Sequence, residues 1–167
     1  MRKLLNYIII ICLSFTLFGC QKTLKGTNEL IDKALEEIEL PSDMNDFDIS
    51  YLGLYSKDNS ALIWFVVEGR DEKLYWAMEC NIVGKDEYRY VRMYTSMPMA
   101  ADIRFLHWKD DEYVFLVNNP NCKTMRFIDN TEIEEITIEK ESVPIIYTSQ
   151  VFPNKCEILD ENGNIIY

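Results

Sequence analysis

From Phe47 onward the chain consists of short β-type runs separated by turn sequences, and this pattern constrains the fold more than any other feature. The runs are rich in β-branched and aromatic residues, whereas the breaks between them are rich in Asn, Asp, Gly and Lys. No helix-length segment lies between them, so parallel βαβ units are not expected. We therefore expect a mainly β (α+β) domain, built as an antiparallel β-sandwich or open barrel. The expected strands are DISYLGLY, ALIWFVVE, KLYWAMEC, YRYVRMYT, DIRFLHW, EYVFLVN, TMRFI, EITIE, PIIYTSQ and the closing pair EILD and NIIY. The segment TEIEEITIEKE, residues 131–141, is expected to be a half-solvated edge strand whose glutamates discourage edge-to-edge pairing.

One amphipathic helix is expected before the β-rich part, over residues 28–39. Asn28 is a suitable N-cap, and Pro41 ends the helix. We expect the helix to pack on the domain, and docking of a partner on it is the alternative. Its apolar residues recur at the spacing of a single helix face: Leu30, Ile31, Ala34, Leu35 and Ile38.

The N-terminal segment has the parts of a secretory signal. Arg2 and Lys3 form a basic start, residues 4–19 are dominated by Ile, Leu and Phe, and no acidic residue precedes Glu29. A helix over residues 4–19 would be about 24 Å long, shorter than the ~30 Å hydrocarbon core of a bilayer. We therefore interpret residues 1–19 as a signal peptide and not as a permanent membrane span.

The sequence Leu17-Phe18-Gly19-Cys20 resembles the lipobox of bacterial lipoproteins, with Leu three positions before the cysteine and Gly one before it. Phe18 departs from that pattern, in which a small residue is usual. The resemblance implies that Cys20 receives a diacylglycerol group and becomes the mature N-terminus. Two acyl chains are enough for stable anchoring. The expected location is the extracytoplasmic face of the cell membrane.

After removal of residues 1–19, 148 residues remain, enough for one compact domain. We expect residues 20–27 to form the lipidated cysteine and a polar tether, and residues 28–167 to form a single mature domain. The mature chain carries 15 basic and 28 acidic residues, a net charge of −13. Such a charge argues against nucleic acid and favours cationic partners, namely basic peptides, divalent ions or basic surfaces. The expected partner is an envelope protein or a cationic peptide. Solubility near an anionic membrane is the simpler explanation.

Three cysteines follow Cys20: Cys80, Cys122 and Cys156. An exported location permits a disulfide, and the preferred pair is Cys122 with Cys156, because both follow turn-forming residues. Free buried thiols are the alternative. The spacing matches no zinc pattern.

No catalytic residue, cofactor or metal site is expected from the sequence. His107 is the only histidine, and a Cys80–His107 nucleophilic pair lacks a recognisable motif. Two acidic segments were compared with calcium loops. SDMNDFD, with Asp43, Asn45, Asp46 and Asp48, is interpreted as a turn, and DENGN, with Asp160, Asn162 and Asn164, as a hairpin closed by a two-residue Asn-Gly loop.

One stretch, EYRYVRMYTSMPM, suggests a partner-binding surface. Strict alternation places an aromatic and arginine stripe on one strand face, formed by Tyr88, Tyr90, Arg92 and Tyr94, opposite Val91, Met93 and Met97. Such residues are enriched at binding hot spots. Met97 and Met99 would add an adaptable apolar loop beside it. The alternative is a strand buried on both faces, with Arg92 at the rim.

Together these features predict a non-catalytic, lipid-anchored binding or scaffolding lipoprotein. A more specific alternative is an acidic decoy that sequesters cationic peptides. The chain resembles the small bacterial immunity lipoproteins in size, anchor and acidic charge. An envelope enzyme without a recognisable motif is the third alternative.

The anchor prediction is tested by the intact mass of the protein extracted from native membranes. We expect the mass of residues 20–167 plus diacylglycerol, and a full-length, unlipidated chain for the Cys20→Ala variant. A full-length mass for the unaltered protein would overturn the lipoprotein interpretation. Repeating the measurement after reduction shows whether the mature chain contains an intramolecular disulfide, because reducing one disulfide adds two hydrogens.

Overall fold

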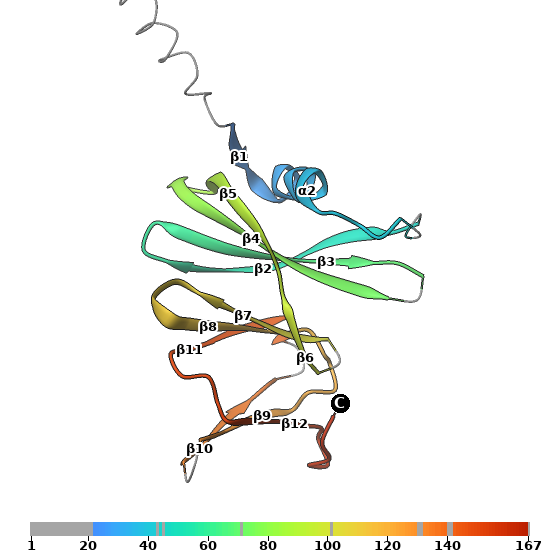
Figure 1. Ribbon diagram of the computed structural model, residues 1–167, viewed down its shortest axis with the longest axis vertical. Helices are drawn as coiled ribbons and strands as arrows, with labels where there is room; N and C mark the ends of the chain where they lie inside the picture. Colours follow the sequence, from blue (N-terminus) through green and yellow to red (C-terminus); the bar gives the residue numbers. More distant parts are fainter. Residues whose placement is uncertain are drawn as a thin grey trace, which may run out of the picture.

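The computed structural model describes residues 22–42, 44, 46–70, 72–100, 102–129, 132–139 and 142–166. The predicted signal peptide and Cys20 lie outside these residues. The described part is a stack of layers, with one α-helix followed by three antiparallel sheets (Figure 1). Strand β1 lies at one end of the stack, and the smallest sheet lies at the other.

The first sheet has five strands in the order β1-β5-β4-β3-β2. Its central strand β3 is buried on both faces, because seven of its first eight residues are apolar and side chains of a strand alternate between faces. The bounds are β1 Thr23–Lys25, β2 Asp48–Lys57, β3 Ser60–Glu68, β4 Lys73–Gly84 and β5 Glu87–Thr95.

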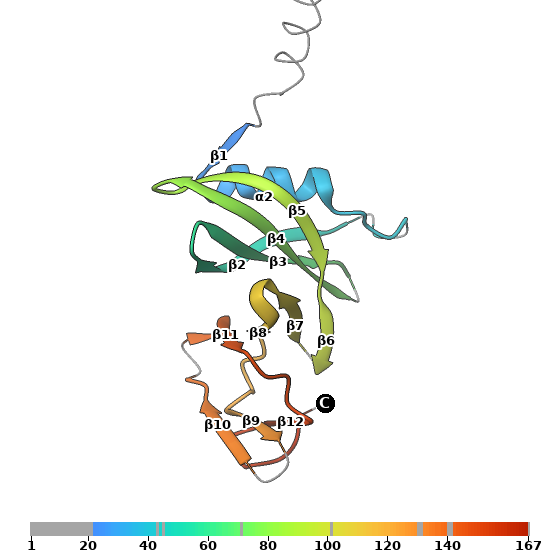
Figure 2. The same ribbon diagram turned by 60° about the vertical axis from the view of Figure 1, so that its left-hand side comes forward.

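Helix α2, Gly26–Glu37, covers the outer face of this sheet (Figure 2). Leu30 and Ala34 are buried in the first core cluster, which lies between α2 and the first sheet, as the amphipathic spacing predicts. The helix starts two residues earlier than expected. The Glu29 carboxylate accepts a hydrogen bond from the Lys25 backbone N–H at 2.8 Å, which satisfies a donor ahead of the first turn.

The predicted tether over residues 20–27 is wrong in its second half. Leu24 is only 3% exposed, and β1 pairs with β5 through Thr23↔Arg89, Leu24↔Tyr88 and Lys25↔Glu87. The chain therefore joins the sheet at Thr23, immediately ahead of α2.

The second sheet has four strands in the order β11-β8-β7-β6, and it is covered on both faces. One face packs on the first sheet, and the other packs on the third. A short 3₁₀ helix, η1 Lys109–Asp111, joins two of its strands. The strand bounds are β6 Met97–Ala100, β7 Ile103–Trp108, β8 Glu112–Val117 and β11 Ile145–Ser149.

Strand β6 corrects the prediction of a loop at Met97–Met99. Met97 pairs with Phe105, and Pro98 pairs with Arg104, at the edge of the second sheet where a proline is tolerated. Because only Ser96 separates β5 from β6, the chain passes almost straight from the first sheet to the second (Figure 2).

The third sheet has three strands in the order β10-β9-β12, with bounds β9 Thr124–Asp129, β10 Glu132–Thr137 and β12 Lys155–Leu159. Strand β10 begins three residues earlier than the predicted EITIE strand. The predicted two-residue hairpin loop is also wrong. The turn closes between Asp160 and Asn164, where Asp160 N–H donates to Asn164 O at 2.9 Å, and Gly163 occupies the left-handed region at φ 79°.

The fold class predicted from the sequence is confirmed: the chain is mainly β with antiparallel sheets and one described α-helix. The sandwich contains three sheets where two are usual. None of the helices in the described part is long and apolar enough to cross a membrane.

Packing of α2 on the sheet is tested by two matched leucine truncations. Leu30 is 3% exposed and Leu35 is 42% exposed on the same helix. We expect Leu30→Ala to lower the free energy of unfolding by about 2–4 kcal/mol, and Leu35→Ala by less than about 0.5 kcal/mol. Urea unfolding measures both. Equal effects would contradict the observed docking of the helix.

Candidate functional site

The predicted Tyr/Arg stripe does not lie on one face of β5. Strand β4 pairs Glu79 with Arg92 and Cys80 with Tyr90, which leaves Val91 as an extra residue in a β-bulge. A bulge shifts the alternation of side chains by one position. The expectation of a single solvent-facing stripe is therefore wrong.

The tyrosines before the bulge face α2. Tyr88 is 8% exposed in the first core cluster, and Tyr90 Oη donates to Glu37 Oε2 at 2.7 Å. Lys33 Nζ lies 4.8 Å from the centre of the Tyr90 ring. Through its contacts with Glu37 and Lys33, Tyr90 holds the helix against the sheet.

The residues after the bulge face the second sheet and bind a buried carboxylate. Glu79 is 4% exposed; Arg92 Nε lies 2.9 Å from its Oε2, Tyr94 Oη donates to the same oxygen at 2.8 Å, and Lys109 Nζ lies 3.2 Å from its Oε1. Burial alone would raise the pKa of Glu79, but these three partners outweigh it and lower the pKa below its ordinary value of 4.5. This network ties the first sheet to η1 of the second.

The two methionines of the predicted surface are separated as well. Met97 is 47% exposed, whereas Met99 packs against the third core cluster, which lies between the second and third sheets. The six residues expected to bind a partner are thus divided among four environments, and Tyr90, Arg92 and Tyr94 already bind carboxylates within the domain.

The three cysteines in the described part of the chain, Cys80, Cys122 and Cys156, are free thiols. Cys122 and Cys156 nevertheless share the third core cluster. Burial, and then the neighbouring Cys122, raise the pKa of Cys156 to about 12. The segments that carry Cys122 and Cys156 meet as expected. The formation of a disulfide between these two cysteines stays a prediction.

The Cys80–His107 pair is not formed. Cys80 lies in the core between α2 and the first sheet, where burial raises its pKa to about 12 and disfavours the nucleophilic thiolate. His107 lies on β7 of the second sheet, where its ring stacks 4.9 Å from that of Tyr113.

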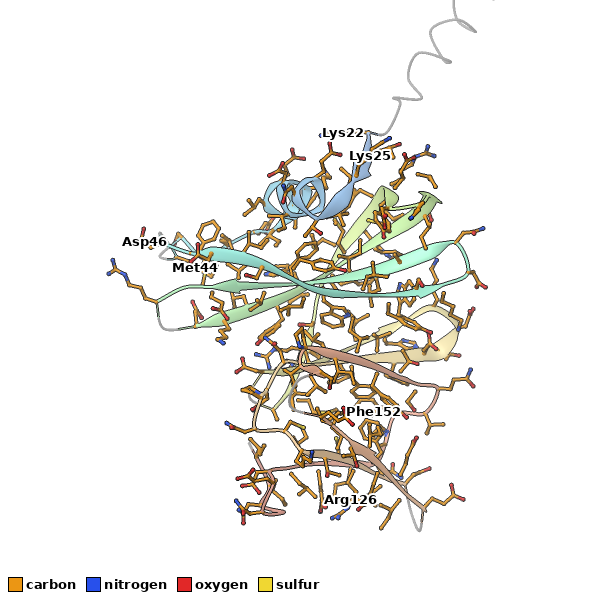
Figure 3. All side chains as sticks on the ribbon, turned by 180° about the vertical axis from the view of Figure 1, so that it is seen from behind. Lys22, Lys25, Met44, Asp46, Arg126 and Phe152 are labelled. Carbon is orange, nitrogen blue, oxygen red and sulfur yellow. The ribbon has the colours of Figure 1, made fainter. Side chains whose placement is uncertain are left out.

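Acidic residues of the two segments considered as calcium loops form contacts within the domain. Asp46 pairs with Arg70 at 3.1 Å, at the loop marked in Figure 3, while Asp43 and Asn45 lie outside the described residues. The Asp160 carboxylate accepts hydrogen bonds from the backbone N–H groups of Asn162 and Asn164. The described residues contain no group of three or more His, Cys, Asp or Glu that could hold a metal ion.

A groove at the far end of the stack is the strongest candidate binding site. It encloses about 550 Å³ between the inner face of the β9–β10 hairpin and the segment 149–153. Three carboxylates line it: Asp129, Glu132 and Glu134. Its apolar lining comes from Phe127, Ile133, Val151 and Pro153. None of its lining residues in the described part of the chain is a lysine or arginine. We call this feature the acidic groove.

Contacts from the second sheet fix the walls of the acidic groove. Tyr147 Oη donates to Glu134 Oε1 at 2.7 Å. Burial, and then this carboxylate, raise the pKa of Tyr147 to about 12, so the phenol remains a donor at neutral pH. Phe152 packs with its ring 4.9 Å from those of Phe105 and Tyr113, which holds the segment 149–153 in place (Figure 3).

The carboxylates on the other face of the third sheet differ from those in the groove. Arg126 contacts Glu135 at 2.7 Å and Glu157 at 3.0 Å, and Lys155 contacts Glu157 at 2.6 Å. That outer face is internally neutralised. The inner face of β10 instead directs negative charge into the acidic groove.

Apolar side chains are exposed beside these carboxylates. Ile133 is 60% exposed, Val151 59% and Phe152 41%. Exposed apolar surface bordered by polar groups is typical of an interaction site. Sequence reasoning missed it: Glu132 and Glu134 lie in the predicted edge strand, but the sequence carries no signal that residues 149–153 would face them.

Comparisons with protein-family models, with curated proteins and with solved structures each give no match to this chain.

The buried carboxylate network predicts a pH-dependent stability. Because the folded pKa of Glu79 is lowered, its contribution is fully present above pH 4.5 and is lost as the pH falls through the folded pKa. We expect Glu79→Gln to lower the free energy of unfolding by about 2 kcal/mol at neutral pH, and the difference from the unaltered protein to narrow below pH 4.5. Urea unfolding over a pH series measures this.

The exposed Glu72 supplies the control, since Glu72→Gln should leave stability unchanged at every pH. A constant difference for Glu79→Gln across the series would show that charge at this position does not stabilise the fold.

Proposed function

We propose that this chain is a non-catalytic, lipid-anchored binding protein of the extracytoplasmic face of the cell membrane, and that the acidic groove binds a cationic segment of its partner. The observation that carries the proposal is the composition of the groove: three carboxylates and four apolar residues, with no basic side chain among its described lining residues. Lysine and arginine side chains suit such a surface, because their charged ends pair with carboxylates while their methylene stems cover apolar area.

The placement of the groove supports this proposal. Thr23 is the third residue after Cys20, so a chain anchored through Cys20 would keep β1 within about 11 Å of the anchored residue. The acidic groove lies in the last layer of the stack, at the opposite end from β1 (Figure 1). An anchor at Cys20 would therefore leave the groove at the end of the stack that is farthest from the membrane.

The net charge of the mature chain supports the same partner. A charge of −13 attracts cationic molecules over the whole surface, and the groove provides a defined place for them to bind. This arrangement favours both a basic envelope protein and a cationic peptide, so it accommodates the decoy alternative as one form of the same activity.

The proposal is tested with a fluorescent peptide of alternating lysine and valine, titrated against the full chain in detergent at low salt. We expect Glu132→Gln combined with Glu134→Gln to weaken binding by about three- to tenfold, because each substitution removes one carboxylate from the groove. Raising the salt to about 0.5 M should weaken binding to the unaltered protein as well.

The matched control is Glu36→Gln combined with Glu39→Gln, on and just after α2 at the other end of the stack. This pair changes the net charge equally and should leave the affinity nearly unchanged. Equal weakening by both pairs would mean that only the overall charge matters, and the groove would not be the binding site.

A further inference from the structure

Strand β10 ends the third sheet and pairs on one side only. Its register with β9 runs from Glu132↔Asp129 to Thr137↔Thr124. No strand in the described part of the chain pairs with its other side. The backbone N–H and C=O groups along such an edge form a template for another strand.

The opposite edge of the same sheet is covered. Beyond β12 the chain turns back, so that Leu159 forms a bridge with Ile165, and Ile166 N–H donates to Ile158 O at 2.7 Å. The C-terminal residues therefore protect one edge of the sheet, while β10 leaves the other edge open to solvent.

The side chains of β10 are unusually exposed for a strand. Every residue except Ile136 is exposed, and Ile133 shows 60% of its surface. Ile136 packs against the third core cluster, which explains an apolar residue at that position. Packing within the domain does not explain the exposed isoleucine at position 133. An apolar side chain on an open edge is accounted for when a second strand lies beside it.

The two faces of β10 specify what kind of strand could be added. Glu132 and Glu134 lie on the face that lines the acidic groove, whereas Glu135 is paired with Arg126 on the outer face. A second copy of β10 would bring like charges together, which disfavours pairing. A strand with basic residues at alternate positions would place them beside Glu132 and Glu134.

We propose that the β10 edge captures an extended cationic peptide by strand addition, with alternate basic side chains directed into the acidic groove and the intervening side chains beside Ile133. This inference rests on the proposed function, because it takes the acidic groove as the binding site. It specifies in addition that the partner segment is extended and that its basic side chains recur at every second residue. Main-chain hydrogen bonds supply affinity in this mode, and alternate side chains supply specificity.

The test compares two peptides of the same sequence, alternating lysine and valine, one of them with methylated backbone nitrogens. Both carry the same charge and side chains, but the methylated peptide cannot donate main-chain hydrogen bonds. We expect it to bind the full chain at least about tenfold more weakly, because several hydrogen bonds are lost. Hydrogen exchange should show new protection of β10 amides only with the unmethylated peptide.

The outcomes separate this inference from the proposed function. Equal binding of the two peptides, still weakened by Glu132→Gln with Glu134→Gln, would leave the groove as the binding site and overturn strand addition. Failure of both peptides to bind at low salt would overturn both proposals. A dimer in the absence of peptide, protected at β10 and dissociated by added peptide, would show that the edge takes a second copy of the chain, and would overturn the cationic peptide as its natural occupant.

Discussion

The second sheet has to be covered on both faces, and this requirement determines the order of the other layers. Along β8, Val114 and Leu116 face one side while Phe115 and Val117 face the other, and all four are buried. A strand that is apolar on both faces is stable only between two packed layers. The first sheet covers one face and the third sheet covers the other. Helix α2 therefore lies at one end of the stack, and the acidic groove lies at the other.

The sequence predicts most strands because their apolar residues and turns are local signals, but it fails where geometry departs from strict alternation. The bulge at Val91 moves Arg92 and Tyr94 to the opposite face from Tyr90, and one extra residue leaves no mark in the local composition. Strand β1 was missed because three residues are too short to show a period. Strand β6 was missed because Pro98 is typical of a loop, although an edge position accepts it.

The acidic groove was beyond local reasoning for a different reason. Its two walls come from residues 132–134 and 149–153, and they meet only because Phe152 and Tyr147 contact the aromatic core and the third sheet. The glutamates of β10 look equivalent in the sequence. Only the register separates Glu135, which pairs with Arg126, from Glu134, which faces the groove. The sequence predicts an edge strand with protective charges, and tertiary packing decides which of its glutamates pair with Arg126 and which line the groove.

Under the proposed anchor at Cys20, the two residues between Cys20 and β1 have a consequence for many copies in one membrane. Molecules anchored at the same end would share one orientation, and lateral diffusion would bring their β10 edges together repeatedly at the same height above the bilayer. A flat apolar edge would polymerise under such two-dimensional crowding. Because two β10 edges would bring the glutamates of both copies close together, each encounter between them would be repulsive. The surface layer of these proteins would stay dispersed, with every edge vacant for a partner of opposite charge.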